Sequence, residues 1–380
     1  MKTWFLIFIL ITLNFAFADP ENGDWTEQNV TLFSTTEADV MVRAGDIDNL
    51  GFGWAVGYDP FSGNTSGYHS YPWTADTLDV DGTDRIMVIS SYNGSPPHGR
   101  DGYTSGTSRP ENLPRPITMH YDLLGTAVYG AALQIFVDDF QAPVWWADYE
   151  VYMNGVQAPF LETIINALSQ TGPVGKLIST QIPPEFLYLL ESDSLGILFD
   201  DNVTGAGDGY AVDFIKLLIN PVGYSYTGTI HGTVYDNDTN ALLEGVTVTA
   251  SNTISEVTGV SGTYNLEYIP AGYVFLEAVK PNYVTYSTFI NLADGADELQ
   301  DIYLQPRPDV PLNVTITETG GFIEVSWDAV IDITSYTVYS SLEAYADESS
   351  WTLELSGITD LLWTETATDV KKFYFVRSVE

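Results

Sequence analysis

Acidic side chains in this chain gather at turn positions, beside glycine or at the end of an apolar run. The groups lie at residues 46–51, 79–84, 138–139, 200–202 and 208–209. Two carboxylates about 4 Å apart repel by roughly 1 to 4 kcal/mol. A calcium ion with about 6 to 8 oxygen ligands turns that repulsion into cross-linking. The pattern therefore predicts an extracellular binding protein that is stiffened by calcium.

The first two acidic groups do not form an EF-hand loop, which binds calcium through a fixed spacing of ligands. Asp46 and Asp48 with Gly51 match its start, but Leu50 and Gly57 stand where the loop needs oxygen ligands. Residues 79–84 fail as well, because their glycine is misplaced. Any metal site must therefore be completed by distant carboxylates and carbonyls. The alternative at each single position is a solvated aspartate that bonds its own backbone.

A loop rich in aromatic residues follows the first acidic group. Rings of this kind stack on the apolar faces of sugars, so the loop is a candidate glycan platform. The alternative is that the rings fill space at the end of a sandwich. The same ambiguity applies to Trp145 and Trp146, of which only one would face inward in a strand. The candidate ligand-binding residues are Trp54, Tyr58, Tyr71 and Trp73.

No reaction centre is predicted. The chain has no His-Glu-x-x-His motif, no Gly-x-Ser-x-Gly elbow and no Walker loop. A glycosidase needs two carboxyls roughly 5 to 9 Å apart. Adjacent pairs such as Asp138-Asp139 and Asp200-Asp201 point to opposite faces if the backbone is extended. An acid/base pair would therefore have to assemble from separate strands. We therefore predict no catalytic residue and favour a protein that is not an enzyme.

The N-terminus and the composition indicate export. Residues 1–18 read as a signal peptide, with an apolar run and the small-x-small site Ala16-Phe17-Ala18 before Asp19. A membrane anchor is the weaker alternative, because the run is short and acidic residues follow at once. Cysteine is absent, so stability must come from packing, size or metal. We expect an extracellular or cell-surface location and no membrane span.

The charge balance limits the partners. There are 13 basic and 51 acidic residues, giving a net charge of -38. This charge repels nucleic acid and anionic membranes. Neutral ligands, cations and basic surfaces remain as partners.

Short runs rich in Val, Ile, Thr, Tyr and Phe, broken by Gly, Asn, Asp and Pro, recur along the chain. They predict antiparallel β-sandwiches. Only residues 160–168 and 183–190 look helical. Proline-rich boundaries at 220–223 and 305–311 divide the mature chain into residues 19–222, 226–306 and 309–380. The predicted fold class is all-β, with three tandem sandwich modules.

The middle module carries the most specific resemblance. Residues 232–248 are followed by Thr258-Gly-Val-Ser-Gly262-Thr-Tyr264, then Ile269-Pro270-Ala-Gly272 and Pro281-Asn-Tyr283. This series resembles the carboxypeptidase regulatory-like domain, a transthyretin-like sandwich grouped with carbohydrate-binding-like folds. The resemblance implies a spacer or docking module and does not by itself imply glycan binding.

The last module resembles a fibronectin type III domain. Residues 311–316, 323–327, 336–339 and 373–379 would form its strands, and Trp327 its buried tryptophan. The resemblance is loose between Ser340 and Thr368. The chain contains no Arg-Gly-Asp tripeptide, so adhesion to integrins through that motif is excluded.

The first module resembles a galactose-binding-like jelly roll in pattern. The resemblance rests on residues 133–139, 149–155, 195–201 and 208–217. In such jelly rolls a structural calcium ties an N-terminal loop to the last strand. The resemblance therefore implies Asp46, Asp48 and Asn49 as ligands at one end, and Asp208 or Asp213 at the other.

These observations favour a secreted binding protein without enzymatic activity, with a calcium-bound jelly roll that engages carbohydrate or cell-envelope partners. One alternative is a secreted glycan-active hydrolase with its active site in residues 19–222. Another is a structural envelope or adhesion component.

Overall fold

The computed structural model gives a chain whose regular structure is almost entirely β, as the sequence predicts. It describes residues 22, 29–67, 83–85, 88–91, 113–170, 174–204, 206, 209–306, 311, 313–330, 333–347, 350–368 and 371–379. The predicted residues Tyr71, Trp73 and Asp208 lie outside these ranges, as do Asp79 and Asp81. Within the described residues no helix has the length and apolar character needed to cross a bilayer.

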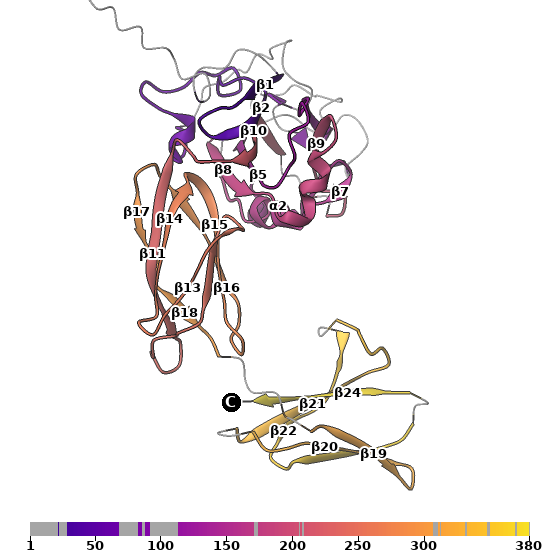
Figure 1. The fold of residues 1–380 in the computed structure, drawn as a ribbon. Coiled ribbons are helices and arrows are strands. Elements are labelled where there is room, and N and C mark those ends of the chain that lie inside the picture. The colour runs from indigo at the N-terminus through magenta and orange to yellow at the C-terminus, as the bar shows by residue number, and fades with distance from the viewer. Residues whose placement is uncertain are drawn as a thin grey trace, which may run out of the picture.

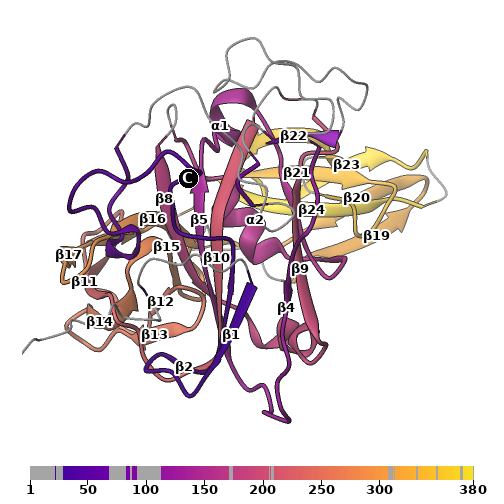
Figure 2. The same ribbon diagram turned by 90° about the horizontal axis from the view of Figure 1, so that it is seen from above.

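The first module is a sandwich of two sheets (Figure 1, Figure 2). The larger sheet has the order β1-β2-β10-β5-β8, with β3 paired to β10, and the smaller has the order β4-β9-β6-β7. The strands of the larger sheet are β1 (Asn29–Phe33), β2 (Ala38–Ala44), β3 (Val88–Ile89), β5 (Ala131–Asp138), β8 (Gly175–Gln181) and β10 (Gly209–Pro221). Those of the smaller are β4 (Ile117–His120), β6 (Glu150–Met153), β7 (Val156–Gln157) and β9 (Ser194–Asp200).

The core of this module lies between the two sheets. Along β9, Leu195, Ile197 and Phe199 are buried while the residues between them face outward, as the two-residue period of a strand requires. In β10 nearly every residue is buried on both faces, because the linker to the middle module and the loop after β2 cover the side away from the main core. β10 is therefore the central strand of the module.

The helical segments are short. Within the described residues they are η1 (Pro60–Ser62, a 3-10 turn), α1 (Ala142–Trp145), α2 (Pro159–Ile165) and η3 (Pro184–Leu190, also 3-10). α2 and η3 occupy the two segments predicted to be helical, and proline begins both. α1 was not expected. Pro143 lies in its first turn, and Trp145 and Trp146 lie at the end of this helix and not in a strand.

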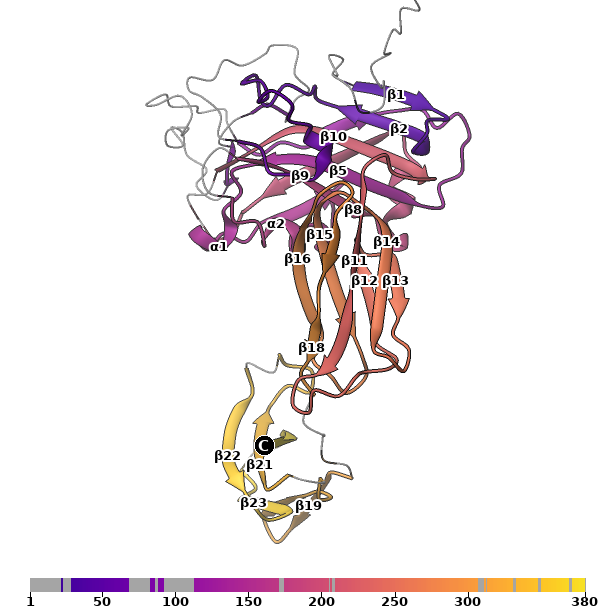
Figure 3. The same cartoon turned by 90° about the vertical axis from the view of Figure 1, so that its left-hand side faces the viewer.

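The middle module is a second sandwich. One sheet contains β11 (Thr227–Asp236), β14 (Thr263–Pro270), β17 (Asp297–Leu299) and β18 (Ile302–Leu304). The other contains β12 (Thr247–Ala250), β13 (Ile254–Val257), β15 (Gly272–Val279) and β16 (Tyr286–Leu292). β15 also pairs with β8 at Tyr273 and Ile178, so this sheet continues the larger sheet of the first module (Figure 3).

The last module has two three-stranded sheets and its own small core. Trp327 is buried there, 5.4 Å from the ring of Tyr336, as expected for the core tryptophan. One sheet has the order β19 (Thr315–Thr319), β20 (Phe322–Ser326) and β23 (Leu362–Thr366). The other has the order β22 (Thr352–Ile358), β21 (Ser335–Ser341) and β24 (Phe373–Val379).

Candidate functional site

The first predicted acidic group forms a tight loop directly after β2. Asn49 and Leu50 have positive φ angles of 63° and 57°. The side chain of Asp48 accepts a hydrogen bond from the N–H of Gly51 at 2.6 Å, and its carbonyl accepts one from Gly53 at 2.8 Å. These bonds hold the loop in one shape.

A bulge in β10 brings a distant carboxylate to this loop. The pairing of β10 with β5 shifts register between Val212 and Phe214, which leaves Asp213 as the extra residue. Bulges re-aim side chains in this way. Asp213 Oδ1 accepts a hydrogen bond from the N–H of Leu50 at 2.8 Å. At Gly45, φ is 83° and a Cβ would lie 2.4 Å from the Asp213 carbonyl oxygen, so only glycine permits this approach.

Asp84 completes the cluster from a third segment. Its N–H donates to the carbonyl of Val212 at 2.8 Å, one residue before the bulge. Carboxylate oxygens of Asp46, Asp48 and Asp84 all lie within 4.8 Å of one another. We call Asp46, Asp48, Asn49, Asp84 and Asp213 the acidic cluster.

Several oxygens of the acidic cluster are buried without a donor. Asp213 is 1% exposed and Asn49 is 3% exposed. Asp46 Oδ1, Asn49 Oδ1 and Asp213 Oδ2 are shielded from solvent and accept no hydrogen bond from the part of the chain that the structure describes. Burial raises the pKa of Asp213 well above its usual range, and the negative charges of Asp48 and Asp46 add to this rise. The N–H groups of Leu50 and Asn49 act in the opposite direction.

This donor set suits a hard divalent cation. Buried acceptor oxygens without donors are costly unless a proton or a cation satisfies them. Carboxylate and amide oxygens from separate segments are the ligands that calcium takes. Of the predicted metal ligands, Asp46 and Asp48 have carboxylate oxygens within 4.8 Å of each other and of Asp84. Asp213 reaches the same loop through its hydrogen bond with Leu50, the residue after Asn49. The structure adds Asp84, which belonged to an acidic group recognised in the sequence but was not selected as a ligand.

The two described residues of the predicted aromatic platform lie against the core. Trp54 stacks on Tyr58 with ring centroids 5.0 Å apart and meets Phe136 edge-on at 5.1 Å. Both are half-buried, and the hydroxyl of Tyr58 donates to the carbonyl of Asn64 at 2.9 Å. Burial raises the pKa of Tyr58, and the charges of nearby aspartates contribute. These rings thus pack beside the acidic cluster, and their role in ligand binding stays a prediction.

Trp145 and Trp146 lie together at the end of α1, and both face solvent. Their side chains are 52% and 85% exposed. Trp146 takes a left-handed conformation, with φ at 54°, that ends the helix. Trp145 Nε1 donates to Gln141 Oε1 at 3.2 Å. The expectation that one ring would face inward depended on a strand and is not met.

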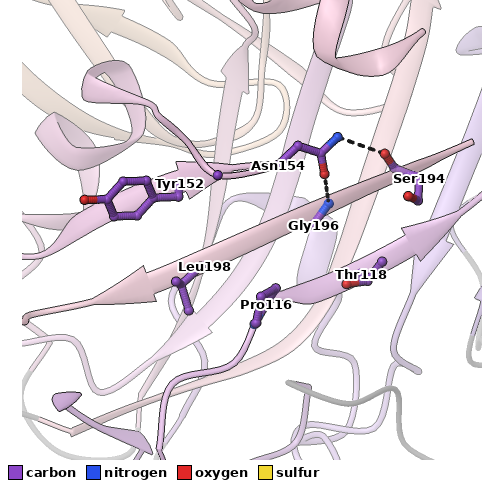
Figure 4. A pocket seen from close by; sticks show the side chains of 8 residues that line it. Pro116, Thr118, Tyr152, Asn154, Ser194, Gly196 and Leu198 are labelled. Atoms are coloured by element: carbon purple, nitrogen blue, oxygen red, sulfur yellow. Dashed lines mark hydrogen bonds between the residues drawn. The ribbon is translucent and has the colours of Figure 1, made fainter. Parts of the chain in front are cut away.

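A groove runs over the outer face of the smaller sheet (Figure 4). Its volume is about 520 Å³. The side chains of Tyr152, Leu198 and Pro116 form apolar walls. Gly196 lies between them, and a Cβ there would lie 3.5 Å from Pro116 Cβ. This groove was not predicted from the sequence, because the outward-facing residues of a strand carry no distinctive sequence pattern. The lining residues are Pro116, Thr118, Tyr152, Asn154, Gly155, Ser194, Gly196 and Leu198.

Some polar side chains of the groove already make hydrogen bonds within the described residues, and others do not. Asn154 bonds within the protein: its Oδ1 accepts from the N–H of Gly196 at 2.8 Å, and its Nδ2 donates to the carbonyl of Ser194 at 3.0 Å (Figure 4). The hydroxyl of Tyr152 donates to Glu150 Oε2 at 2.7 Å. The hydroxyls of Thr118 and Ser194 make no hydrogen bond within the described residues. A neutral, hydroxyl-bearing ligand matches this lining.

The paired carboxylates considered for catalysis make structural hydrogen bonds. Asp200 accepts from the backbone N–H of Ser91 at 2.9 Å and from its hydroxyl. Asp201 caps its own turn by accepting from the N–H groups of Val203 and Thr204 at 3.1 and 2.8 Å. These hydrogen bonds give both carboxylates a structural role.

Comparison with known families identifies the middle module. Residues 229–305 match the family model of the carboxypeptidase regulatory-like domain. This stretch is a carboxypeptidase regulatory-like domain. The resemblance stated from the sequence is thereby confirmed. No curated protein sequence matches the chain.

Solved structures with some similarity include three examples. A candidate carbohydrate-binding protein from Bacteroides uniformis is 13% identical over 40% of this chain and 79% of its own, with a TM-score of 0.19. The pilus 2b backbone protein of group B streptococcus is 13% identical over 50% and 91%, with a TM-score of 0.19. The FN1–FN3 domains of chicken CNTN1 are 10% identical over 47% and 78%, with a TM-score of 0.17. At these TM-scores the similarity supports no conclusion for this chain.

Proposed function

We propose that this chain is a secreted, non-enzymatic binding protein whose first module holds a structural calcium ion and binds carbohydrate. The observation that carries the proposal is the acidic cluster, in which buried oxygens of Asp46, Asn49 and Asp213 lack hydrogen-bond donors among the described residues. A cation would satisfy these oxygens and join the loop after β2 to β10. The regulatory-like domain and the last module would then act as spacers.

Electrostatics supports calcium at this site. At an effective dielectric constant near 20, two carboxylates about 4 Å apart repel by about 4 kcal/mol. The chain also has a net charge of -38, so protein cations are scarce. Calcium accepts irregular sets of about 6 to 8 oxygens, whereas magnesium demands a near-octahedral set. A cluster built from separate segments fits the more tolerant ion.

The groove on the smaller sheet supports carbohydrate as the ligand. A pyranose ring has an apolar face that can stack on Tyr152, and its hydroxyls can meet those of Thr118 and Ser194. No acidic or basic residue lines the groove within the described part of the chain. A neutral sugar is therefore favoured, because the described lining of the groove offers no charged side chain to pair with a charged sugar. The negative net charge of the protein would also repel an acidic sugar.

Calcium removal is the first test. Chelation should lower the melting temperature of the first module, because a ligand present at about 100 times its Kd stabilises the folded state by about 2.7 kcal/mol. Asp48→Ala and the near-isosteric Asp213→Asn should abolish the response to chelator and calcium. Differential scanning calorimetry of the full chain measures this.

The matched control is Asp193→Asn, since Asp193 is exposed and directly precedes β9 of the smaller sheet, whereas the acidic cluster lies beside β10 of the larger sheet. This variant should melt and respond to calcium like the unchanged protein. A melting profile of the unchanged protein that is identical with calcium and with chelator would contradict the calcium proposal.

Sugar binding is tested separately on a glycan array followed by calorimetric titration. Tyr152→Ala should weaken binding of a neutral glycan about tenfold, equivalent to about 1.4 kcal/mol, because the stacking surface is lost. Tyr188→Ala is the control, since Tyr188 is 57% exposed on η3 outside the groove. Equal loss in both variants, or no glycan bound by the unchanged chain, would rule out this groove.

A further inference from the structure

Lys216 is a buried cation in the middle of β10. Its side chain is 0% exposed. It lies on the side of the sheet away from the main core, where its Nζ is 4.9 Å from the centre of the Phe61 ring. Removing an ammonium group from water is costly unless its partners compensate fully. The groups that contact Lys216 therefore decide whether its charge is stable in this position.

Within the described residues, the side chains of Asn22 and Glu37 contact the Lys216 amine. Asn22 Oδ1 lies 2.5 Å from Lys216 Nζ. Glu37 Oε2 also contacts Nζ, as an ion pair in which Glu37 is 2% exposed. The other oxygen of Glu37 accepts from Asn22 Nδ2 at 3.3 Å and from the N–H of Ser225 at 2.8 Å. One fixed carboxylate thus touches both the amine and the amide.

We propose that Lys216 and Asn22 become joined by an intramolecular isopeptide bond in the folded chain. The bond forms between Lys216 Nζ and Asn22 Cγ. Glu37 carries the protons. No cofactor, metal or oxidant takes part.

The reaction balances as an amide exchange. A proton first passes from the Lys216 ammonium to Glu37, leaving a neutral amine. The amine attacks Asn22 Cγ, and its remaining excess proton moves through Glu37 to the departing nitrogen. The C–N bond to the Asn22 side-chain nitrogen breaks, and one ammonia leaves. The product is one secondary amide with no net change in oxidation state.

The surroundings set the resting charge of the pair and hold the reacting groups together away from water. Burial acts to raise the pKa of Glu37, but the charge and hydrogen bond of Lys216 outweigh it, so the pKa is lowered and the resting pair is charged. Proton transfer from Lys216 removes both buried charges at once. Holding two reacting groups in contact replaces a bimolecular encounter and corresponds to effective concentrations of about 10⁵ M or more. Glu37 and Lys216 are shielded from water, which would otherwise compete.

The bond would tie the start of the mature chain to the central strand of the first module. Asn22 lies after the predicted cleavage site, so it stays in the exported protein. The two residues are 194 positions apart. A cross-link over so long a loop restricts the unfolded chain strongly. In a chain without cysteine it would take the place of a disulfide.

Mass spectrometry of the full chain from Asp19 onward tests the proposal. The intact mass should fall short of the sequence mass by one ammonia, and proteolysis should release a linked pair of peptides containing Asn22 and Lys216. Lys216→Arg and Glu37→Gln should show the full sequence mass and no linked pair. Asn22→Asp should lose water instead of ammonia if it still reacts.

The control is Lys176→Arg, which alters another lysine of the first module. Lys176 is half-buried on β8, with its amine over the ring of Tyr273, and this variant should keep the linked pair. Asn22 precedes Gly23, so succinimide formation would also release ammonia, and only the linked peptides identify the cross-link. An unchanged mass of the folded protein would overturn the proposal. So would ammonia loss without linked peptides, or loss that persists in Lys216→Arg. Because the unchanged protein gives the deciding result, misfolding of a variant does not obscure it.

Discussion

Two buried aspartates in this chain show how the surroundings of a carboxylate decide its role. Asp213 has one oxygen bonded to Leu50 and one without a donor among the described residues. Asp236, at the end of β11, has both oxygens satisfied. Its Oδ1 accepts from Thr239, and its Oδ2 accepts from the hydroxyl of Tyr283 at 2.8 Å. The first arrangement invites a cation, whereas the second closes a turn.

Asp236 gives a prediction about acid stability in the regulatory-like domain. Burial acts to raise its pKa, but the hydrogen bonds from Thr239 and Tyr283 outweigh burial and lower the pKa below its ordinary value of 3.8. Its contribution to stability is therefore complete above pH 3.8 and is lost as the pH falls through the lowered value. Acid unfolding curves should show this slope, and Asp236→Asn should flatten it. An unchanged slope in the variant would contradict the assignment.

At the scale of elements, β10 organises the first module. It pairs with β2 and β5 along its length and with β3 at its start. Its bulge turns Asp213 toward the acidic cluster, and three residues later Lys216 faces Asn22 and Glu37. Further along, Asn220 Oδ1 accepts from the N–H of Tyr129 at 2.9 Å. One strand thus positions both proposed sites.

Local pattern allowed the strands to be predicted but not their irregularities. The apolar run that became β5 and the alternation along β11 both follow from the two-residue period of strands. The bulge at Asp213 has no such signature, because it arises from pairing with a strand some eighty residues earlier. α1 was missed for a related reason. Four residues are too few to show a helical period.

At the scale of the whole molecule, the first two modules share a close junction (Figure 3). Ser179 Oγ donates to the carbonyl of Ala271 at 2.5 Å, and Asp294 N donates to the carbonyl of Ser62 at 2.8 Å. Tyr226 donates to Asp59 Oδ2 at 2.7 Å. These bonds and the pairing of β8 with β15 connect the two sandwiches at several points, in addition to the covalent linker.

Gly63 allows a test of this junction. Its φ is 77°, and a Cβ there would lie 2.0 Å from the carbonyl oxygen of Leu292 in the regulatory-like domain. Gly63→Ala should therefore separate the modules and cost about 1 to 3 kcal/mol beyond backbone strain. The expected result is a lower and broader melting transition by calorimetry.

Gly125→Ala is the matched control for backbone strain. Gly125 has a φ of 82° with nothing within 4 Å of its Cβ position, so this variant should show the strain alone. Equal destabilisation by the two substitutions would mean that the junction contributes nothing to stability.

The sequence by itself determined the all-β class, the regulatory-like domain and the gathering of acids in turns, because these features depend on residue period and turn chemistry within short segments. Only the tertiary structure decided which acids meet. Leu50 and Asp213 are 163 positions apart, and Asp84 reaches the same point from a third segment. The groove on the smaller sheet and the contact of Lys216 with Asn22 were decided in the same way. Side chains from distant strands become neighbours only after the sheets pair and pack, and no local spacing records that event.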